Sequence, residues 1–282
     1  PIIHLGRIKG TNPCGELPLL PYESCNLGHI NLEKFVREGE IQWDRLEEIV
    51  ALGVHFLDNV ITLNPYPIPE IEEGTKKTRK IGLGVMGFAD LLIKLGIPYA
   101  SKEAVDLARE IMEFVTRIGR EESVVLAEER GSFPNFPVSI WPEKGYSALR
   151  NASVTTIAPT GTTSIVADCS AGIEPIFALG FVQKNVMKDG DEIVKVNELF
   201  KDMAKDHGFY SEALVRKVAE TGSCQGLKDV PQDVQELFKN SHEVSPEWHI
   251  KIQAAFQKHT DSAVSKTINF PHSTTVDEIR DA

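Results

Sequence analysis

The sequence predicts an α/β protein, because long helical patterns alternate along it with short apolar runs. Apolar residues recur every third or fourth position over 44–63 and 101–130, as one buried face of a helix requires. Short apolar runs bounded by Gly, Pro or polar residues cover 81–87, 154–158 and 264–269. Strands that alternate with longer helices are typical of α/β architecture.

Each expected helix has a recognisable start or stop. The first takes Asp44 as its N-cap and ends at the proline-rich run 64–69. The longest begins after the N-cap Ser101 and ends before Gly131. Residues 1–31 carry no periodicity and read as an extended segment followed by a loop. Further helical stretches are expected from the glycine run at 81–87 to Gly96 and over 197–207, 211–220 and 246–259.

Composition excludes some classes of protein. A net charge of −11 argues against a basic surface for nucleic acid, although a few main-chain amides can still hold a nucleotide phosphate. No apolar run approaches the roughly 20 residues of a membrane span. The chain starts without Met and stops just after Thr275-Val276-Asp277-Glu278, a capping box that opens a helix, so we expect it to be a piece of a longer protein.

The four cysteines, Cys14, Cys25, Cys169 and Cys224, form no Cys-x-x-Cys pair and have no histidine at zinc-ligand spacing. We therefore expect no metal site. Free cysteines in an acidic chain indicate a reducing compartment, and we expect a cytoplasmic protein. Cys169 and Cys224 are interpreted as small buried apolar residues.

The glycine run Ile81-Gly82-Leu83-Gly84-Val85-Met86-Gly87 allows two interpretations. It fits the G-x-G-x-x-G pattern of a dinucleotide site, and an acidic residue about 20 positions on would bind the ribose. Alternatively, the glycines let a strand and a helix pack closely. We favour close packing, because the charged and proline-rich segment before the run leaves little room for the preceding strand.

A second candidate site is the turn Pro159, Thr160, Gly161, Thr162 and Thr163, which follows a buried strand. Proline presets a turn, glycine permits close approach, and hydroxyls lie beside free amides at a helix start. That combination suits a phosphate, but it lacks the lysine of a P-loop. A hydroxyl-rich N-cap turn without any ligand explains the same residues, and the sequence pattern alone leaves both readings open.

The third candidate is the cluster Asn12, Cys14 and Glu16, followed by Cys25. In an extended segment these three alternate residues point to one side. A thiol, a carboxylate and an amide on one cavity can serve as radical or nucleophile, base and orienting group. Structural cysteines beside a polar loop are the alternative, but two thiols in a Pro- and Gly-rich loop next to a glutamate favour a catalytic role.

Several segments resemble the catalytic subunits of ribonucleotide reductases. Thr11-Asn12-Pro13-Cys14-Gly15-Glu16 and Glu23-Ser24-Cys25-Asn26-Leu27-Gly28 look like the finger loop of that family. The resemblance implies a ten-stranded α/β barrel of the ribonucleotide reductase and glycyl radical enzyme type, with residues 1–282 as its carboxy-terminal portion. Residues 1–31 would form a strand and the finger loop. The further matching segments are 66–69, 79–85, 150–153, 158–164 and 172–175, of which 157–164 would be the substrate phosphate loop.

The resemblance is strongest to the adenosylcobalamin-dependent class. Members that take their radical from a separate subunit carry two adjacent tyrosines shortly after a Lys-Thr pair. Here Ser265-Lys266-Thr267-Ile268-Asn269-Phe270-Pro271 has none. The resemblance therefore implies adenosylcobalamin as cofactor. A large subunit that uses a separate metal-radical subunit, and a non-catalytic nucleotide-binding barrel, are the alternatives.

The same resemblance implies a role for each site residue. Cys14 would become a thiyl radical and remove the 3′ hydrogen of a ribonucleotide. Glu16 would take the 3′-hydroxyl proton while Asn12 holds the ribose. Cys25, with a partner thiol upstream of this chain, would reduce the substrate radical. The substrate phosphate would lie on Pro159, Thr160, Gly161, Thr162 and Thr163, across a cavity from Cys14.

The resemblance also implies partners. The substrate would be a ribonucleoside di- or triphosphate, and dNTP or ATP effectors would bind outside this chain. A thioredoxin-like protein would supply electrons, and the full-length protein would be a homodimer. Neither nucleic acid nor a membrane is expected as a partner.

Overall fold

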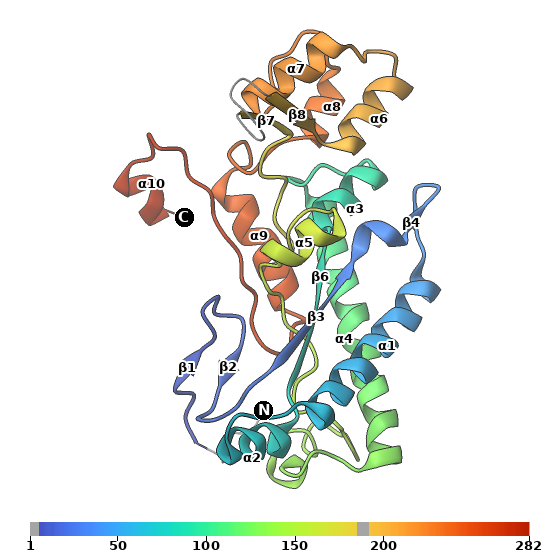
Figure 1. Ribbon diagram of the computed structural model, residues 1–282, viewed down its shortest axis with the longest axis vertical. Coiled ribbons are helices and arrows are strands. Elements are labelled where there is room, and N and C mark those ends of the chain that lie inside the picture. Colours follow the sequence, from blue (N-terminus) through green and yellow to red (C-terminus); the bar gives the residue numbers. More distant parts are fainter. Residues whose placement is uncertain (1–5, 185–191, 282) are drawn as a thin grey trace.

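The computed structural model describes residues 6–184 and 192–281, and its centre is a pair of parallel strands. Strands β3 (Asn26–Asn31) and β6 (Ile81–Met86) run side by side with Asn26 opposite Ile81 and Asn31 opposite Met86 (Figure 1). All of β6 is buried, as expected for a parallel strand covered on both faces. Residues 1–5 of the expected amino-terminal segment lie outside the described residues.

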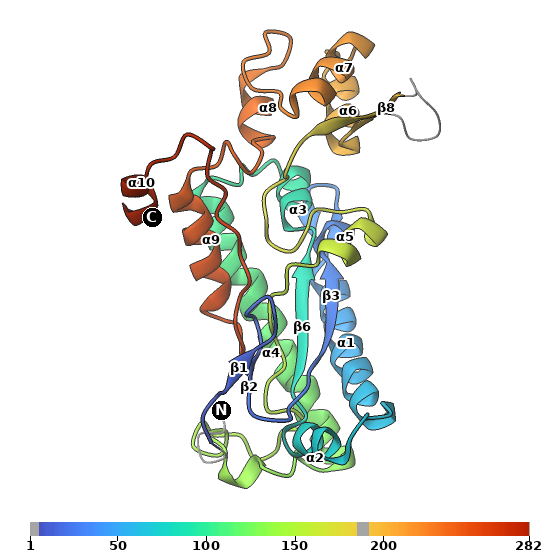
Figure 2. The ribbon, with the colours of Figure 1, turned by 60° about the vertical axis from the view of Figure 1, so that its left-hand side comes forward.

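Helices cover one face of this pair, and a short hairpin covers the other (Figure 2). Helix α1 (Trp43–Leu63) packs against β3, β6 and helix α4 (Lys102–Arg130), and α4 also packs against α9 (Pro246–Gln257). On the opposite side lie β1 (Gly10–Thr11) and β2 (Pro18–Leu19), which are antiparallel. The hairpin carries the first candidate residues.

The caps expected for α4 are confirmed. The Ser101 hydroxyl accepts a hydrogen bond from the Ala104 N–H at 3.1 Å, and Gly131 ends the helix at φ +81°. Helix α1 ends at Leu63, as expected, but its N-cap is Gln42, so Asp44 lies in the first turn instead. Helices α3 (Phe88–Leu95) and α6 (Glu198–Asp206), like α9, fall within the expected ranges, and α7 (Glu212–Thr221) ends one residue beyond its expected range.

Two expected strands are shorter in the structure. Residues 154–158 join β6 by a parallel bridge between Leu83 and Thr155, and Ile157 bridges Val264. The expected strand over 264–269 is therefore wrong beyond its first residue. Beyond that residue the main chain bonds to side chains, because the Thr267 N–H donates to Glu174 at 2.8 Å and the Thr267 carbonyl accepts from Lys266 at 2.6 Å.

Of the remaining helices and strands, only α5 (Gly161–Ala167) and α10 (Val276–Asp281) were expected from the sequence. Helix α5 follows the hydroxyl-rich turn, and α10 follows the capping box, in which Glu278 accepts from the Thr275 N–H at 2.7 Å. Both agree with the sequence. The others are η2 (Leu32–Phe35), β4 (Val36–Arg37), β5 (Glu40–Ile41), α2 (Pro69–Thr78), η3 (Phe136–Val138), β7 (Gly180–Lys184), β8 (Glu192–Val196) and α8 (Gln232–Leu237).

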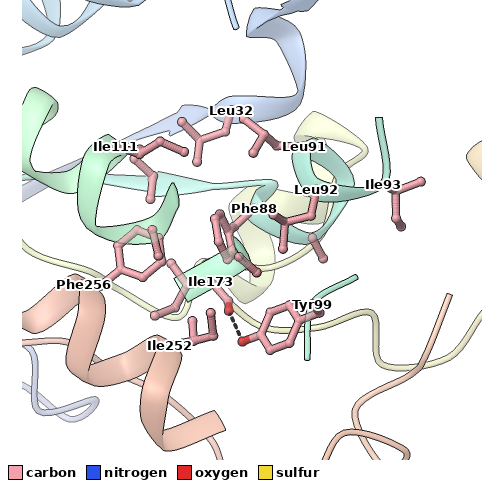
Figure 3. Packing of buried hydrophobic residues seen from close by; sticks show 14 of the residues in the cluster. Leu32, Phe88, Leu91, Leu92, Ile93, Tyr99, Ile111, Ile173, Ile252 and Phe256 are labelled. Atoms are coloured by element: carbon pink, nitrogen blue, oxygen red, sulfur yellow. Dashed lines mark hydrogen bonds between the residues drawn. The ribbon is translucent and has the colours of Figure 1, made fainter. Parts of the chain in front are cut away.

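One part of the main core lies between α3, α4 and α9 (Figure 3). The Phe88 ring packs edge-on against Phe256, and Tyr99 donates a hydrogen bond to the Ile173 carbonyl at 2.7 Å. Burying the Tyr99 ring therefore leaves its hydroxyl satisfied. This contact also fixes the segment that follows α5.

The strands in the described residues form four two-stranded pairs and bridges and do not close into a barrel. Elements β7, β8, α6, α7 and α8 gather at one end of the molecule (Figure 1). Within residues 6–184 and 192–281, none of the helices is both long and apolar enough to span a membrane.

Candidate active site

Cys14 lies in a tight turn at the tip of the β1–β2 hairpin. The Gly15 N–H donates to the Asn12 carbonyl at 3.0 Å, with Pro13 in the second position of the turn and Gly15 at φ +82°. The expectation of an extended segment with three side chains on one side is therefore wrong. Proline and glycine favour the turn, which leaves Cys14 exposed, while Asn12 Oδ1 accepts from the Leu17 N–H at 3.0 Å.

Glu16 is buried against the inner side of the strands, with 1% of its surface exposed. Its carbonyl accepts hydrogen bonds from the Thr156 hydroxyl and the Ala263 N–H, both at 2.9 Å. Its Oε2 is buried without a hydrogen-bond partner. A buried carboxylate oxygen with no partner costs free energy unless a ligand or water completes it, which makes Glu16 a candidate for ligand binding.

The two faces of β3 can be told apart from its contacts. The Asn26 amide donates to the Leu57 carbonyl of α1 at 2.8 Å, so Asn26 faces the helices. A Cβ on Gly82 would lie 2.5 Å from Leu27 and 2.7 Å from Thr156, so Leu27 faces the hairpin. Side chains alternate along a strand, which puts Cys25 on the Leu27 face, toward Glu16.

The chemistry of Cys25 agrees with that position. Burial, opposed by Lys80 and reinforced by the charges of Glu23 and Glu16, raises the pKa of the Cys25 thiol to about 12. Lys80 and Glu23 form a buried ion pair at 2.7 Å, and Glu23 also accepts from the Thr78 hydroxyl at 2.8 Å. Cys25 is therefore a protonated thiol near the Glu16 carboxylate.

The hydroxyl-rich turn forms a fixed helix start. Thr160 adopts φ +55°, and its hydroxyl accepts from the Gly172 N–H at 2.7 Å. The first N–H groups of a helix have no acceptor inside it, and Gly161, Thr162 and Thr163 are exposed at the start of α5. Pro159 precedes them and is partly buried. The turn thus presents free amides, while the Thr160 hydroxyl is already used in the hydrogen bond with Gly172.

The turn and the thiols belong to opposite ends of the strand pair. Gly87, which follows β6, donates from its N–H to the Ser170 carbonyl at 2.8 Å, and a Cβ on it would lie 2.4 Å from Asn31 Oδ1. The segment after α5 therefore lies at the carboxyl end of β3, whereas Cys25 precedes its amino end. The nucleotide-sized cavity expected between them stays a prediction.

The glycine run supports the close-packing interpretation. A Cβ on Gly84 would lie 2.3 Å from the Thr156 carbonyl oxygen, so two main chains meet there with no room for a side chain. Gly87 adopts φ +71° at the N-cap of α3. The run is itself the strand β6, and its glycines make space for Leu27 and Thr156.

The other two cysteines differ from each other. Cys224 is fully buried, as expected, and burial raises its pKa to about 12. Cys169 is only partly buried, so the expectation of a buried residue is wrong for it. It follows α5 in a loop, where burial and then the charge of Asp90 raise its pKa to about 11.

Sequence reasoning missed His29. It shares the Leu27 face of β3, and its Nε2 is buried without a hydrogen-bond partner. Burial lowers the pKa of His29, and the Glu16 charge opposes that shift, so the two groups lie near each other. Alternation would have placed His29 on this face only if a strand had been predicted over 26–31, which it was not.

A buried thiol beside a carboxylate on one face of parallel strands, with a second thiol at an exposed hairpin tip, defines an α/β domain with a candidate thiol site. The family model described as "Ribonucleotide reductase, barrel domain" matches residues 1–148 and 143–282. The chain therefore belongs to the ribonucleotide reductase barrel-domain family.

The chain is also similar in sequence to known ribonucleotide reductases. Over 280 residues, the chain is 49% identical to the vitamin B12-dependent ribonucleoside-diphosphate reductase of Mycobacterium tuberculosis (strain CDC 1551 / Oshkosh), covering 99% of this chain and 40% of that protein. It is 50% identical to the protein of the same name from Thermoplasma acidophilum, covering 99% and 36%. The chain thus spans about two fifths of the length of these relatives.

A solved structure shares the fold. The Actinobacillus ureae class Id ribonucleotide reductase alpha subunit superposes with a TM-score of 0.73 at 24% identity, covering 91% of this chain and 46% of that chain. A more distant relative by sequence is the ribonucleoside-diphosphate reductase subunit alpha of Chlamydia pneumoniae, at 31% identity over 93% of this chain and 29% of that protein.

Proposed function

We propose that this chain is the thiol-bearing part of a ribonucleotide reductase, which reduces ribonucleotides to 2′-deoxyribonucleotides for DNA synthesis. The observation that carries the proposal is the buried, unpartnered Glu16 carboxylate between an exposed Cys14 and a protonated Cys25. Membership of the reductase barrel family supports it. Residues 1–282 would form the carboxy-terminal portion of a ten-stranded barrel, with 1–31 as strand and finger loop.

In this proposal Cys14 carries the thiyl radical and removes the 3′ hydrogen atom of the substrate ribose. Its exposed position at the hairpin tip leaves the sulfur free to reach a ligand. Glu16 accepts the 3′-hydroxyl proton at Oε2, the atom that the protein leaves without a partner. Asn12 uses its oxygen for Leu17, so its amide nitrogen remains to hold the ribose.

Cys25 supplies reducing equivalents. Reduction replaces the 2′ hydroxyl by hydrogen, releases water and converts two thiols into one disulfide. A thiol with a pKa of about 12 keeps its proton at neutral pH, so Cys25 starts as a hydrogen donor. Its partner thiol would come from upstream of this chain, and a thioredoxin-like protein would reduce the disulfide.

Adenosylcobalamin fits the hairpin as the source of one-electron chemistry. The tip is exposed, and a Cβ on Gly15 would meet no atom within 4 Å, so a large group has room beside Cys14. The names of the Mycobacterium tuberculosis and Thermoplasma acidophilum relatives include vitamin B12, which supports this cofactor. When bound, it supplies the oxidant that converts a thiol into a thiyl radical.

Residues 159–163 would bind the substrate phosphate. The exposed amides of Gly161, Thr162 and Thr163 at the start of α5 are suitable donors, with the Thr162 hydroxyl beside them, while the Thr163 hydroxyl donates to the Thr160 carbonyl at 3.2 Å. Thr160 would act indirectly, because its hydroxyl holds Gly172. Pro159 would set the turn.

The wider proposal concerns the full-length protein. The substrate is a ribonucleoside diphosphate or triphosphate, and the diphosphate is favoured by the relatives' names. Nucleotide effectors and the homodimer contacts would lie outside this chain. A cytoplasmic location, where free thiols stay reduced, completes the proposal.

The test uses the full-length protein with adenosylcobalamin, a ribonucleoside diphosphate and a dithiol. We expect Cys14→Ser to abolish deoxyribonucleotide formation and Cys224→Ala, a distant buried thiol, to retain it. Unchanged activity of Cys14→Ser would refute the catalytic role. Wild-type activity that needs a separate metal-containing subunit instead of adenosylcobalamin would identify the alternative class.

A further inference from the structure

His29 lies on the Leu27 face of β3. Along the strand it lies between Cys25 at the amino end and the segment after α5 at the carboxyl end. It is opposite Gly84 in the register, two residues beyond Leu27 on the same face. A strand rises about 3.3 Å per residue, so His29 is roughly 13 Å along the chain from Cys25 and 7 Å from Asn31.

Glu16 reaches the same level of the strand pair from the hairpin. Its carbonyl is bonded to the Thr156 hydroxyl, and the Thr156 main chain meets Gly84, the residue opposite His29. The main chain of Glu16 is therefore anchored near the level of Gly84, the residue that pairs with His29.

Both groups carry a buried atom that the protein does not satisfy. Glu16 Oε2 and His29 Nε2 have no hydrogen-bond partner, so they do not bond to each other either. Orphaned polar atoms are costly inside a protein, and two of them on one face indicate a polar ligand. A neutral imidazole offers one donor and one acceptor nitrogen, which suits hydroxyl and phosphate oxygens.

We propose that His29 is a substrate-binding residue, whose Nε2 hydrogen-bonds the sugar–phosphate portion of a ribonucleotide held between Glu16 and residues 161–163. This inference rests on the proposed function and deepens it.

The test is equilibrium binding of CDP to the full-length protein without cofactor, by isothermal titration calorimetry. Loss of one hydrogen bond predicts about 10-fold weaker binding for His29→Leu. His29→Gln, whose amide nitrogen replaces Nε2, should stay within about 3-fold of wild type. The matched control is His207→Leu, an exposed histidine at the end of α6, which should bind CDP like wild type.

Steady-state kinetics give a second readout. KM for the ribonucleotide should rise about 10-fold in His29→Leu, with a much smaller change in kcat, because uniform binding is lost. If His29→Leu does not fold, His29→Asn replaces it, since its amide mimics Nδ1 and should lose the same 10-fold.

Wild-type affinity in a folded His29→Leu or His29→Asn protein would overturn this inference and leave the reductase proposal standing. Absence of CDP binding by the wild-type protein would overturn both. Weak binding in the leucine variant that glutamine restores would support the inference.

Discussion

Gly84→Ala is expected to destabilise the strand pair severely. An added Cβ would lie 2.3 Å from the Thr156 carbonyl oxygen, whereas a carbon and an oxygen in contact are about 3.3 Å apart. The two main chains must therefore separate by about 1 Å, and neither atom is the end of a flexible side chain.

The magnitude follows from the bonds at that point. Leu83 donates to the Val154 carbonyl at 2.8 Å, and Thr156 donates to the Leu83 carbonyl at 3.1 Å. Weakening two such bonds costs about 2 kcal/mol, and overpacking adds about 1–3 kcal/mol. We therefore expect a loss of about 3–5 kcal/mol in the free energy of unfolding.

The assay is the thermal unfolding midpoint of the full-length protein, with hydrogen exchange at the Leu83 and Thr156 amides as a local readout. A loss of 3 kcal/mol corresponds to a midpoint lower by about 6–12 °C in a cooperative unit of 150–250 residues, and by less in a larger one. Gly10→Ala is the control, because its Cβ would meet no atom within 4 Å. A Gly84→Ala midpoint and amide protection equal to those of the control would refute the reasoning.

Three further predictions follow from buried groups. Arg79→Met should cost about 3–5 kcal/mol in denaturant unfolding, because it removes a main partner of the fully buried Asp58; a loss below 1 kcal/mol would contradict this. In peptide mapping after iodoacetamide at pH 8, Cys14 should react well before Cys25, whose pKa is about 12; equal rates would argue against burial of the Cys25 thiol. Burial, and then the charge of Lys266, lowers the pKa of His249 from 6.5 to about 4. As the pH falls, the unfolded chain therefore binds a proton at this histidine before the folded protein does. Stability should fall by about 1.4 kcal/mol per pH unit from pH 6.5 to about 4, and His249→Gln should lose that component; an unchanged pH profile in the variant would be the contrary result.

Local signals made the long helices predictable. The α4 caps at Ser101 and Gly131 act within one turn, so the sequence alone carries them. The same holds for α10, where Thr275 and Glu278 bond reciprocally. These elements depend little on the rest of the protein.

The site could not be predicted in the same way, because it depends on contacts between residues far apart in the sequence. Alternation at Asn12, Cys14 and Glu16 predicted an extended segment, but Pro13 and Gly15 impose a turn that separates the exposed thiol from the buried carboxylate. Strand β3 was missed because only pairing with β6 reveals it. For the same reason His29 had no place in the predicted site.

The hydrogen bonds that hold Glu16 have a consequence for biosynthesis. One partner, Thr156, lies 140 residues further along the chain, and the other, Ala263, comes later still. A ribosome-bound nascent chain that has made only the cysteine hairpin has nothing to fix the carboxylate. Contacts of such long sequence separation form late in folding. Glu16 is therefore fixed in place only after nearly all of this chain has been translated, and a shorter nascent chain carries Cys14 without the assembled site.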